Sequence, residues 1–144
     1  MSGYDHPAPH VIELEVEAQD IDAYEHVNNA VYLTWLDRAA WSHSGALGMP
    51  LERCVALRRG MAALRAEIDF ARAAVAGDRV RVATWIAESD GRLRVGRRFQ
   101  IVRVADGVTL VRARTEYVCI NLDSGRAVRM PEAFARAYVV TINN

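Results

Sequence analysis

The sequence predicts a single α+β domain in which one long helix packs on an antiparallel sheet. Residues 29–45 place apolar side chains at the three- and four-residue spacing of a helix. Most of the remaining chain alternates apolar and polar side chains, as strands with one buried face do. The chain has 144 residues and a mass of 16.0 kDa, which is the size of one domain, so we assign residues 1–144 to it.

The elements follow in order along the chain. Alternation over residues 12–18 predicts the first strand, and a polar stretch separates it from the helix. After the loop at residues 48–50 the chain reads as sheet, with strands near residues 62–71, 80–86, 92–104 and 108–121 and turns at Gly77-Asp78, Asp90-Gly91 and Asp106-Gly107. Pro131 begins a short terminal helix. The large apolar residues and alanines of the long helix predict that it is mostly buried.

The amino-acid composition excludes or disfavours several classes of function. Eighteen basic and eighteen acidic residues leave no net charge, which disfavours nucleic acid as a partner. Every basic residue is Arg, so chemistry that needs lysine is excluded. No apolar run is long enough for a membrane helix and Met1–His10 lacks the pattern of a signal peptide, so we expect a cytoplasmic protein with no membrane partner. Cys54 and Cys119 are expected to be buried and reduced, and the sequence offers no metal site.

The polar stretch before the helix carries the candidate chemistry. It gathers Asp22, His26, Asn28 and Asn29 at the point where the helix begins. A carboxylate near a helix N-terminus faces backbone N–H groups that can polarise a substrate carbonyl. Acyl transfer to water needs this pairing of a base or nucleophile with an oxyanion donor. The alternative for each residue alone is a surface loop with a helix cap.

This segment resembles the hot-dog-fold acyl-CoA thioesterases. The resemblance rests on Asp22-x-x-x-His26-Val27-Asn28-Asn29-x-x-Tyr32 and on Trp35-Leu36-Asp37-Arg38-Ala39, with weaker likeness at Ala66–Phe70, Thr115–Val118 and Pro131-Glu132. The branch that it is similar to includes 4-hydroxybenzoyl-CoA thioesterase and the plant acyl-carrier-protein thioesterases. The resemblance implies a long central helix wrapped by a curved antiparallel sheet. It also implies a homodimer or homotetramer with active sites at the dimer interface.

The resemblance implies roles for the motif residues. Asp22 is the catalytic carboxylate, either as base or as nucleophile, and the backbone N–H of Asn29 faces the thioester carbonyl. The His-Val-Asn-Asn string is similar to that of the acyl-carrier-protein branch and implies that His26 and Asn28 belong to the site. For these two residues, a loop-orienting histidine and a helix cap are the alternatives.

The expected reaction is hydrolysis of an acyl-CoA to a carboxylic acid and coenzyme A, with no metal or other cofactor. An acyl-carrier-protein thioesterase and a non-catalytic acyl-CoA-binding protein are the alternatives. Tyr32 belongs to the motif and is expected to bind substrate. Arg58, Arg59 and Arg92 are candidates for the phosphates of coenzyme A, because the arginine fork donates two hydrogen bonds at once. Ion pairs on the strand faces are the alternative for each arginine.

Overall fold

The computed structural model describes residues 3–142 as one curved sheet with helices on its concave side. Its strands are β1 (His10–Glu15), β2 (Arg59–Phe70), β3 (Arg79–Ser89), β4 (Arg94–Arg103) and β5 (Thr109–Asn121). Its helices are the short 3-10 turn η1 (Ala18–Asp20), then α1 (Asn29–Ala46), α2 (Leu51–Leu57) and α3 (Glu132–Ala137).

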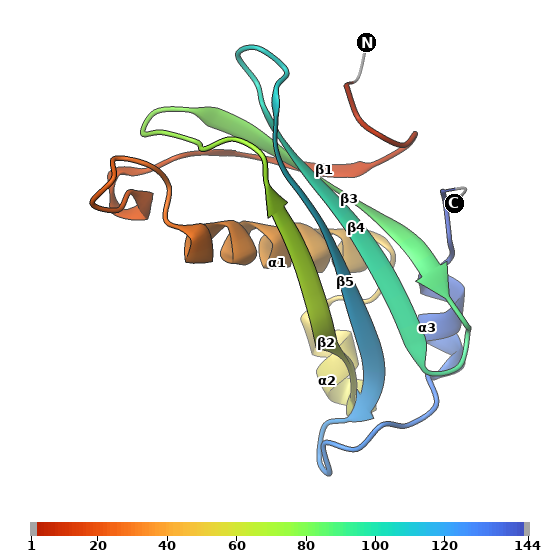
Figure 1. The fold of residues 1–144 in the computed structure, drawn as a ribbon. Coiled ribbons are helices and arrows are strands. Elements are labelled where there is room, and N and C mark those ends of the chain that lie inside the picture. The colour runs from red at the N-terminus through yellow and green to blue at the C-terminus, as the bar shows by residue number, and fades with distance from the viewer. Residues whose placement is uncertain (1–2, 143–144) are drawn as a thin grey trace.

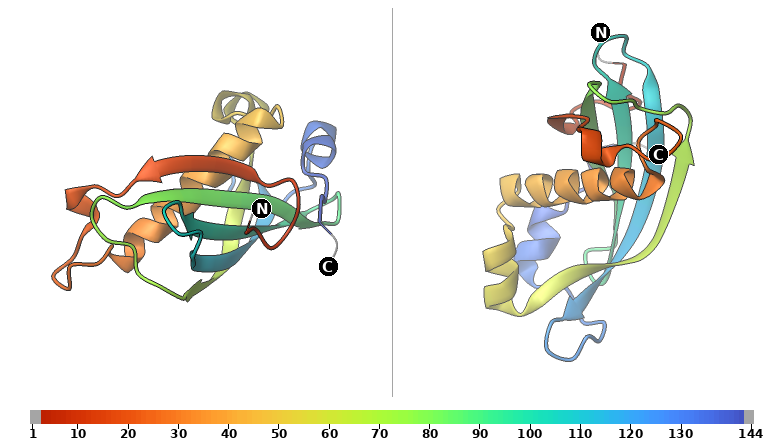
Figure 2. Two further views of the ribbon diagram at one scale, coloured as in Figure 1. Left: turned by 90° about the horizontal axis from the view of Figure 1, so that it is seen from above. Right: turned by 90° about the vertical axis from the view of Figure 1, so that its left-hand side faces the viewer.

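The strands lie in the order β1-β3-β4-β5-β2, and each neighbouring pair is antiparallel. The sheet bends around α1, which crosses its concave face (Figures 1 and 2). This arrangement confirms the α+β, hot-dog architecture. Because β2 stands at one edge of the sheet, its outer backbone groups have no strand beside them among residues 3–142.

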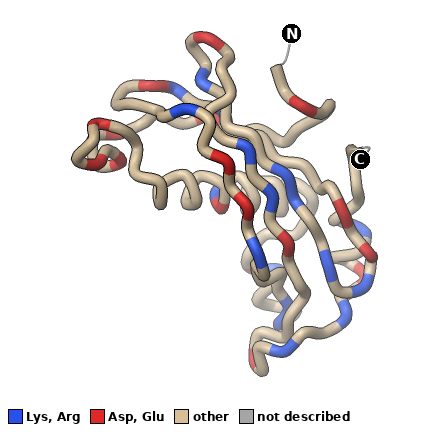
Figure 3. The backbone as a smooth tube through the Cα atoms, viewed as in Figure 1, with Lys and Arg blue, Asp and Glu red and all other residues tan. Residues whose placement is uncertain are grey.

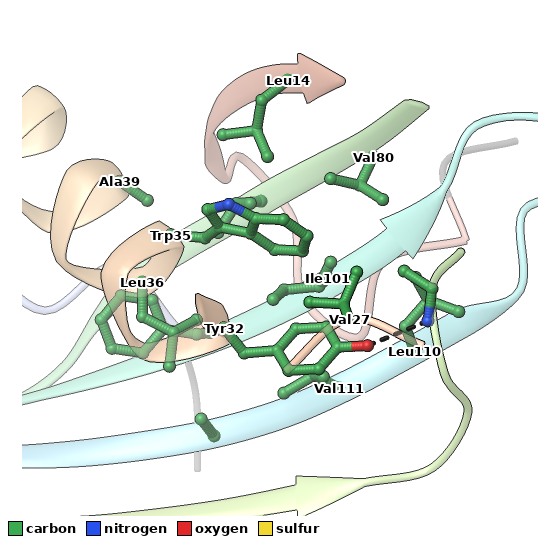
Figure 4. Packing of buried hydrophobic residues seen from close by; sticks show 14 of the residues in the cluster. Leu14, Val27, Tyr32, Trp35, Leu36, Ala39, Val80, Ile101, Leu110 and Val111 are labelled. Carbon is green, nitrogen blue, oxygen red and sulfur yellow. Dashed lines mark hydrogen bonds between the residues drawn. The ribbon is translucent and has the colours of Figure 1, made fainter. Parts of the chain in front are cut away.

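The main core lies between α1 and the sheet. Tyr32, Trp35, Leu36 and Ala39 point from the helix towards side chains such as Ile101 (Figure 4). Further members of the same cluster are Leu14, Val27, Val80, Leu110 and Val111. The four helix positions recur at three- and four-residue intervals, so a single stripe of α1 is buried.

The expectation that α1 is mostly buried is wrong for the single chain. Leu33 and Trp41 are 48% and 44% exposed, and Asp37 between them is also exposed. Residues four apart share one face of a helix, so these three form a single uncovered stripe. The physical reason is that one sheet covers only one side of a helix.

A helix replaces sheet directly after Pro50. The prediction that the chain continues as strands is wrong for residues 51–57, which form α2. Arg58 ends this helix in the left-handed conformation, at φ 52°, and of its seven residues only Cys54 is buried. Two turns with one buried residue leave too little periodicity for a helix to be recognised from the sequence.

The remaining predictions for secondary structure are confirmed, with shifted boundaries. The first strand ends at Glu15, and the chain then turns into η1. The terminal helix begins after Pro131 as expected. Cys54 and Cys119 are both free and buried, in a second cluster where α2 and α3 pack on the sheet. No helix within residues 3–142 combines the length and apolar character that crossing a bilayer requires.

Candidate active site at the start of helix α1

A pocket of about 340 Å³ opens where α1 begins. The loop before the helix supplies one wall and the chain leaving β2 supplies the other. The pocket is lined by Asp22, Tyr24, His26, Val27, Asn29, Tyr32, Phe70, Ala71, Arg72 and Ala73. The structure therefore brings together four of the residues expected from the sequence, namely Asp22, His26, Asn29 and Tyr32.

A tight turn fixes the carboxylate of Asp22. Its Oδ1 accepts a hydrogen bond of 2.8 Å from the N–H of Tyr24, and its own N–H donates to the carbonyl of His26 at 2.9 Å. Glu25, at the tip, takes a left-handed conformation with φ 65°. No described residue donates a hydrogen bond to Oδ2 of Asp22. The turn thus holds one carboxylate oxygen and leaves the other for chemistry.

Asp20 has a different role from Asp22, although the two carboxylates are only two positions apart. The Oδ2 of Asp20 accepts a hydrogen bond of 2.9 Å from the N–H of Glu17, which closes the η1 turn. Its carbonyl accepts from the N–H of Asn28 at 2.9 Å. Asp20 therefore shapes the loop, and it does not line the pocket.

The first turn of α1 presents an unused donor to the pocket. The Oδ1 of Asn28 caps the helix by accepting a hydrogen bond of 2.9 Å from the N–H of Ala30. The N–H of Asn29 has no acceptor among residues 3–142, and Asn29 lines the pocket. The capping alternative for Asn28 is thus observed, while a contact between Asn28 and substrate stays a prediction. The free N–H of Asn29 is one of the donors that a helix N-terminus leaves unsatisfied.

Tyr32 joins α1 to the far wall of the pocket. Its ring is only 2% exposed, and its hydroxyl accepts a hydrogen bond of 2.9 Å from the N–H of Ala74 (Figure 4, dashed line). The carbonyl of Ala74 in turn accepts from the N–H of Val27 at 3.0 Å. Burial raises the pKa of Tyr32, and the carboxylates of Asp78 and Asp22 raise it further. Tyr32 therefore stays a neutral phenol that anchors the wall.

The sequence reasoning missed most of that wall. Ala71, Arg72 and Ala73 follow the end of β2 and line the pocket opposite Asp22. Phe70 is expected only as a strand residue and as part of the resemblance, and its ring centroid lies 5.6 Å from that of Tyr32. Two alanines and a single arginine after a strand form no recognisable motif, so only the fold could place them here.

Comparison with known proteins decides the family. The model of the thioesterase-like superfamily matches residues 16–138. The chain belongs to this superfamily. Comparison with curated proteins finds no match.

Solved structures of other proteins share the fold. One is a 1,4-dihydroxy-2-naphthoyl-CoA thioesterase from Synechocystis, with a TM-score of 0.81 and 23% identity over 91% of this chain and 96% of that chain. A hypothetical protein from Thermus thermophilus has a TM-score of 0.82 and 27% identity over 90% and 96% of the two chains. A Staphylococcus aureus protein in complex with CoA has a TM-score of 0.83 and 18% identity over 90% and 81%.

The three candidate phosphate-binding arginines lie away from the pocket of this thioesterase-like chain. Arg59 begins β2 and Phe70 ends it, so about 36 Å of strand separates them. Arg58 pairs with Asp123 at 2.7 Å, as the ion-pair alternative expects. Within one chain, neither Arg58 nor Arg59 lines the pocket, and their role stays a prediction.

Arg92 lies at the same end of the sheet, in the turn between β3 and β4. The Oδ1 of Asp90 organises this turn by accepting hydrogen bonds from three successive backbone N–H groups. These bonds, from the N–H groups of Arg94, Arg92 and Leu93, lower the pKa of Asp90 to about 2. The loop that holds Asp22, at the opposite end of the sheet, contains acidic but no basic residues (Figure 3).

Proposed function

We propose that this chain hydrolyses an acyl-CoA thioester to a free carboxylic acid and coenzyme A. One observation carries the proposal: the unpaired Oδ2 of Asp22 and the unpaired N–H of Asn29 line the same pocket. The first is a base or nucleophile and the second is an oxyanion donor. Membership of the thioesterase-like superfamily supports the reaction class, and the Synechocystis neighbour named for an acyl-CoA substrate agrees with it.

The mechanism follows from the positions of these two groups. The thioester carbonyl oxygen accepts a hydrogen bond from the N–H of Asn29, and the helix dipole favours the negative charge that develops there. Asp22 either removes a proton from the attacking water or attacks the carbonyl carbon itself, forming an anhydride that water then cleaves. In both routes the C–S bond breaks and coenzyme A leaves as a thiolate, which takes up a proton.

The other pocket residues bind and orient. His26 is exposed at the pocket and can donate a hydrogen bond to the ligand. The Oδ1 of Asn28 is used by the cap, so its contribution is to hold the helix start, while its amide NH₂ donates to none of the described residues. Tyr32 keeps the wall in place through Ala74. No metal or cofactor enters these steps.

A dimer would bring the candidate phosphate-binding arginines close to the pocket. The free edge of β2 and the uncovered stripe of α1 are the surfaces that a second copy would cover. Antiparallel pairing of two β2 edges places the Arg59 end of one strand beside the Phe70 end of the other. Arg58 and Arg59 of one protomer then approach the Asp22 pocket of its partner, where they can bind phosphate.

The test is release of free thiol from a panel of acyl-CoA and acyl-carrier-protein thioesters by the purified chain. The Synechocystis neighbour puts aromatic thioesters such as benzoyl-CoA on the panel beside short and long alkyl ones. We expect hydrolysis of at least one acyl-CoA. Cleavage of acyl-carrier-protein substrates alone supports that alternative, and binding of acyl-CoA without thiol release supports a non-catalytic protein.

Asp22→Asn separates catalysis from folding. The amide keeps an oxygen for the N–H of Tyr24, so the turn survives, but it is neither base nor nucleophile. We expect kcat to fall by about 10²–10⁴. Asp20→Asn is the matched control, because it makes the same change in the same loop outside the pocket. Equal activities of the two variants would contradict the assignment of Asp22.

A further inference from the structure

A second cavity lies beside the C-terminal half of α1. Its volume is about 160 Å³, and Ala40, which lines it, is about 16 Å along the helix from Asn29. Five elements meet there, α1, α2, β2, β4 and β5, together with Tyr138 after α3. No residue that lines the Asp22 pocket lines this cavity.

Arg97 is the unusual group in this cavity. It is only 4% exposed, and it makes no ion pair within residues 3–142. Its Nη1 donates a hydrogen bond of 2.8 Å to Nδ1 of His43, and its Nη2 donates to Oγ of Ser44 at 3.0 Å. A guanidinium only donates, so His43 accepts through Nδ1 and is neutral. These contacts orient Arg97 without bringing a negative charge to it.

The charge of Arg97 is only partly compensated. The bonds from Arg97 reach the last turns of α1, where the helix dipole contributes about half an elementary charge of negative sign. The ring of Tyr138 lies 5.8 Å from the guanidinium and adds a weaker attraction. Burial lowers the pKa of Arg97, because a cation loses hydration when it is taken out of water.

Asp37 is the acid that lines the cavity, and it does not neutralise Arg97. Asp37 is exposed, and the two residues form no ion pair. Solvent screens the carboxylate at the rim, whereas the guanidinium lies where screening is weak. An anion that enters the cavity therefore encounters a net attractive charge.

The remaining walls of the cavity are suited to an apolar ligand group. Trp41, Met61 and Tyr117 surround the remaining space. A cavity of about 150 Å³ accommodates a molecule the size of benzene. We propose that this cavity binds the carboxylate of a small apolar acid, with the carboxylate on Arg97 and the ring or short chain against Trp41 and Met61. The carboxylate belongs either to a free acid or to the far end of an acyl group.

Isothermal titration of the full chain with benzoate and with benzamide tests the proposal without any mutation. The two molecules have the same shape, but only benzoate is charged. We expect benzoate to bind at least about tenfold more tightly, because a charge-assisted hydrogen bond to the guanidinium is gained. Equal affinities, or no benzoate binding at millimolar concentration, would overturn the proposal.

Arg97→Met assigns the selectivity to the guanidinium. No ion pair is lost, and replacing a buried charge with an apolar side chain is often tolerated. We expect the preference for benzoate to disappear. Arg94→Met is the matched control, because Arg94 is on the same strand but exposed, and it does not line this cavity. A preference that survives Arg97→Met, or that Arg94→Met removes equally, contradicts the assignment.

Ala63→Phe keeps the test decisive if Arg97→Met does not fold. Ala63 is an exposed strand residue that lines the cavity, so a phenyl group there fills the space while Arg97 remains. We expect benzoate binding to be lost. Unchanged binding to the folded variant would place the ligand elsewhere and overturn the proposal.

Hydrolysis of glutaryl-CoA and pentanoyl-CoA distinguishes the two sources of the carboxylate. A higher kcat/KM for glutaryl-CoA that Arg97→Met abolishes assigns the carboxylate to the acyl group. Equal values for the two thioesters, together with Arg97-dependent binding of benzoate, assign it to a free acid. This second measurement rests on the proposed hydrolysis, whereas the titration does not, so the two proposals fail separately.

Discussion

Removing one hydroxyl group tests how α1 is tied to the wall of the candidate active site. In Tyr32→Phe the aromatic ring stays, so its contacts with Trp35 at 5.2 Å and with Phe70 at 5.6 Å are kept. The lost atom is the acceptor for the N–H of Ala74. Ala74 is 0% exposed, so water cannot replace that acceptor without rearrangement of the wall.

The expected magnitude follows from that geometry. A buried N–H left without a partner costs about 1–3 kcal/mol, whereas the unchanged ring packing adds nothing further. For a chain of this length, 1 kcal/mol shifts the melting temperature by about 2–4 °C. We therefore expect Tyr32→Phe to lower the free energy of unfolding by about 1–3 kcal/mol and the melting temperature by about 2–12 °C.

Urea unfolding and thermal melting at one fixed protein concentration measure the effect, because association makes both depend on concentration. Tyr24→Phe is the matched control. Tyr24 is 83% exposed, so removal of its hydroxyl should change the free energy of unfolding by less than about 0.5 kcal/mol. If the two variants are equally stable, the bond between Tyr32 and Ala74 does not anchor the wall.

Two further variants probe charge. Burial, with the charges of Arg97 and His10, lowers the pKa of His43 to about 4, so the unfolded chain binds a proton more readily than the folded one. His43 therefore contributes stability above about pH 6.5 that is lost as the pH falls towards 4. His43→Asn keeps an acceptor for Arg97 and should reduce this loss of stability, as measured by urea unfolding at several pH values. An unchanged pH dependence would contradict the assignment to His43. Arg92→Ala should raise the KM for an acyl-CoA and leave kcat nearly unchanged, with no effect on an acyl-pantetheine that lacks the nucleotide. If Arg92→Ala slows the hydrolysis of both substrates equally, Arg92 does not bind the phosphates of coenzyme A.

The sequence predicted the parts of the molecule that depend on local pattern. Strands and α1 were found because their apolar residues repeat with a fixed period over six or more positions. Most of the candidate site was found because Asp22, His26, Asn29 and Tyr32 stand within eleven residues on one loop and the first helical turn. A site that is formed by one contiguous segment can be predicted without knowing which other elements pack against it.

The cavity at Arg97 could not be found in this way. Alternation correctly places Arg94 and Arg97 on opposite faces of β4, since Arg94 is exposed and Arg97 is buried. Whether the inner face carries a buried cation or a solvated one depends on α1 lying over it. That information is in the tertiary arrangement, because the walls come from residues as far apart as Asp37 and Tyr138.

The two ends of α1 have opposite polarity. A dimer would bring the N-terminal end of one α1 close to the C-terminal half of the partner's α1. The N-terminal end presents the N–H of Asn29, and the C-terminal half holds Arg97. If two copies pair through β2 about a twofold axis, their α1 helices run antiparallel. The Asp22 pocket of one protomer then approaches the Arg97 cavity of its partner. A substrate with a terminal carboxylate would be held by both chains.

Complementation between inactive chains tests this shared site. We expect light scattering to give a mass of at least twice 16.0 kDa. Chains with Asp22→Asn and chains with Arg97→Met should each hydrolyse glutaryl-CoA poorly. In a mixed dimer, Asp22 of one chain faces Arg97 of the other, so one of the two sites is intact. Random mixing in equal amounts makes half of the dimers mixed, so activity should recover to about a quarter of the wild-type value. A 16.0 kDa species with full activity, or no recovery after mixing and refolding, would show that each chain carries its own complete site.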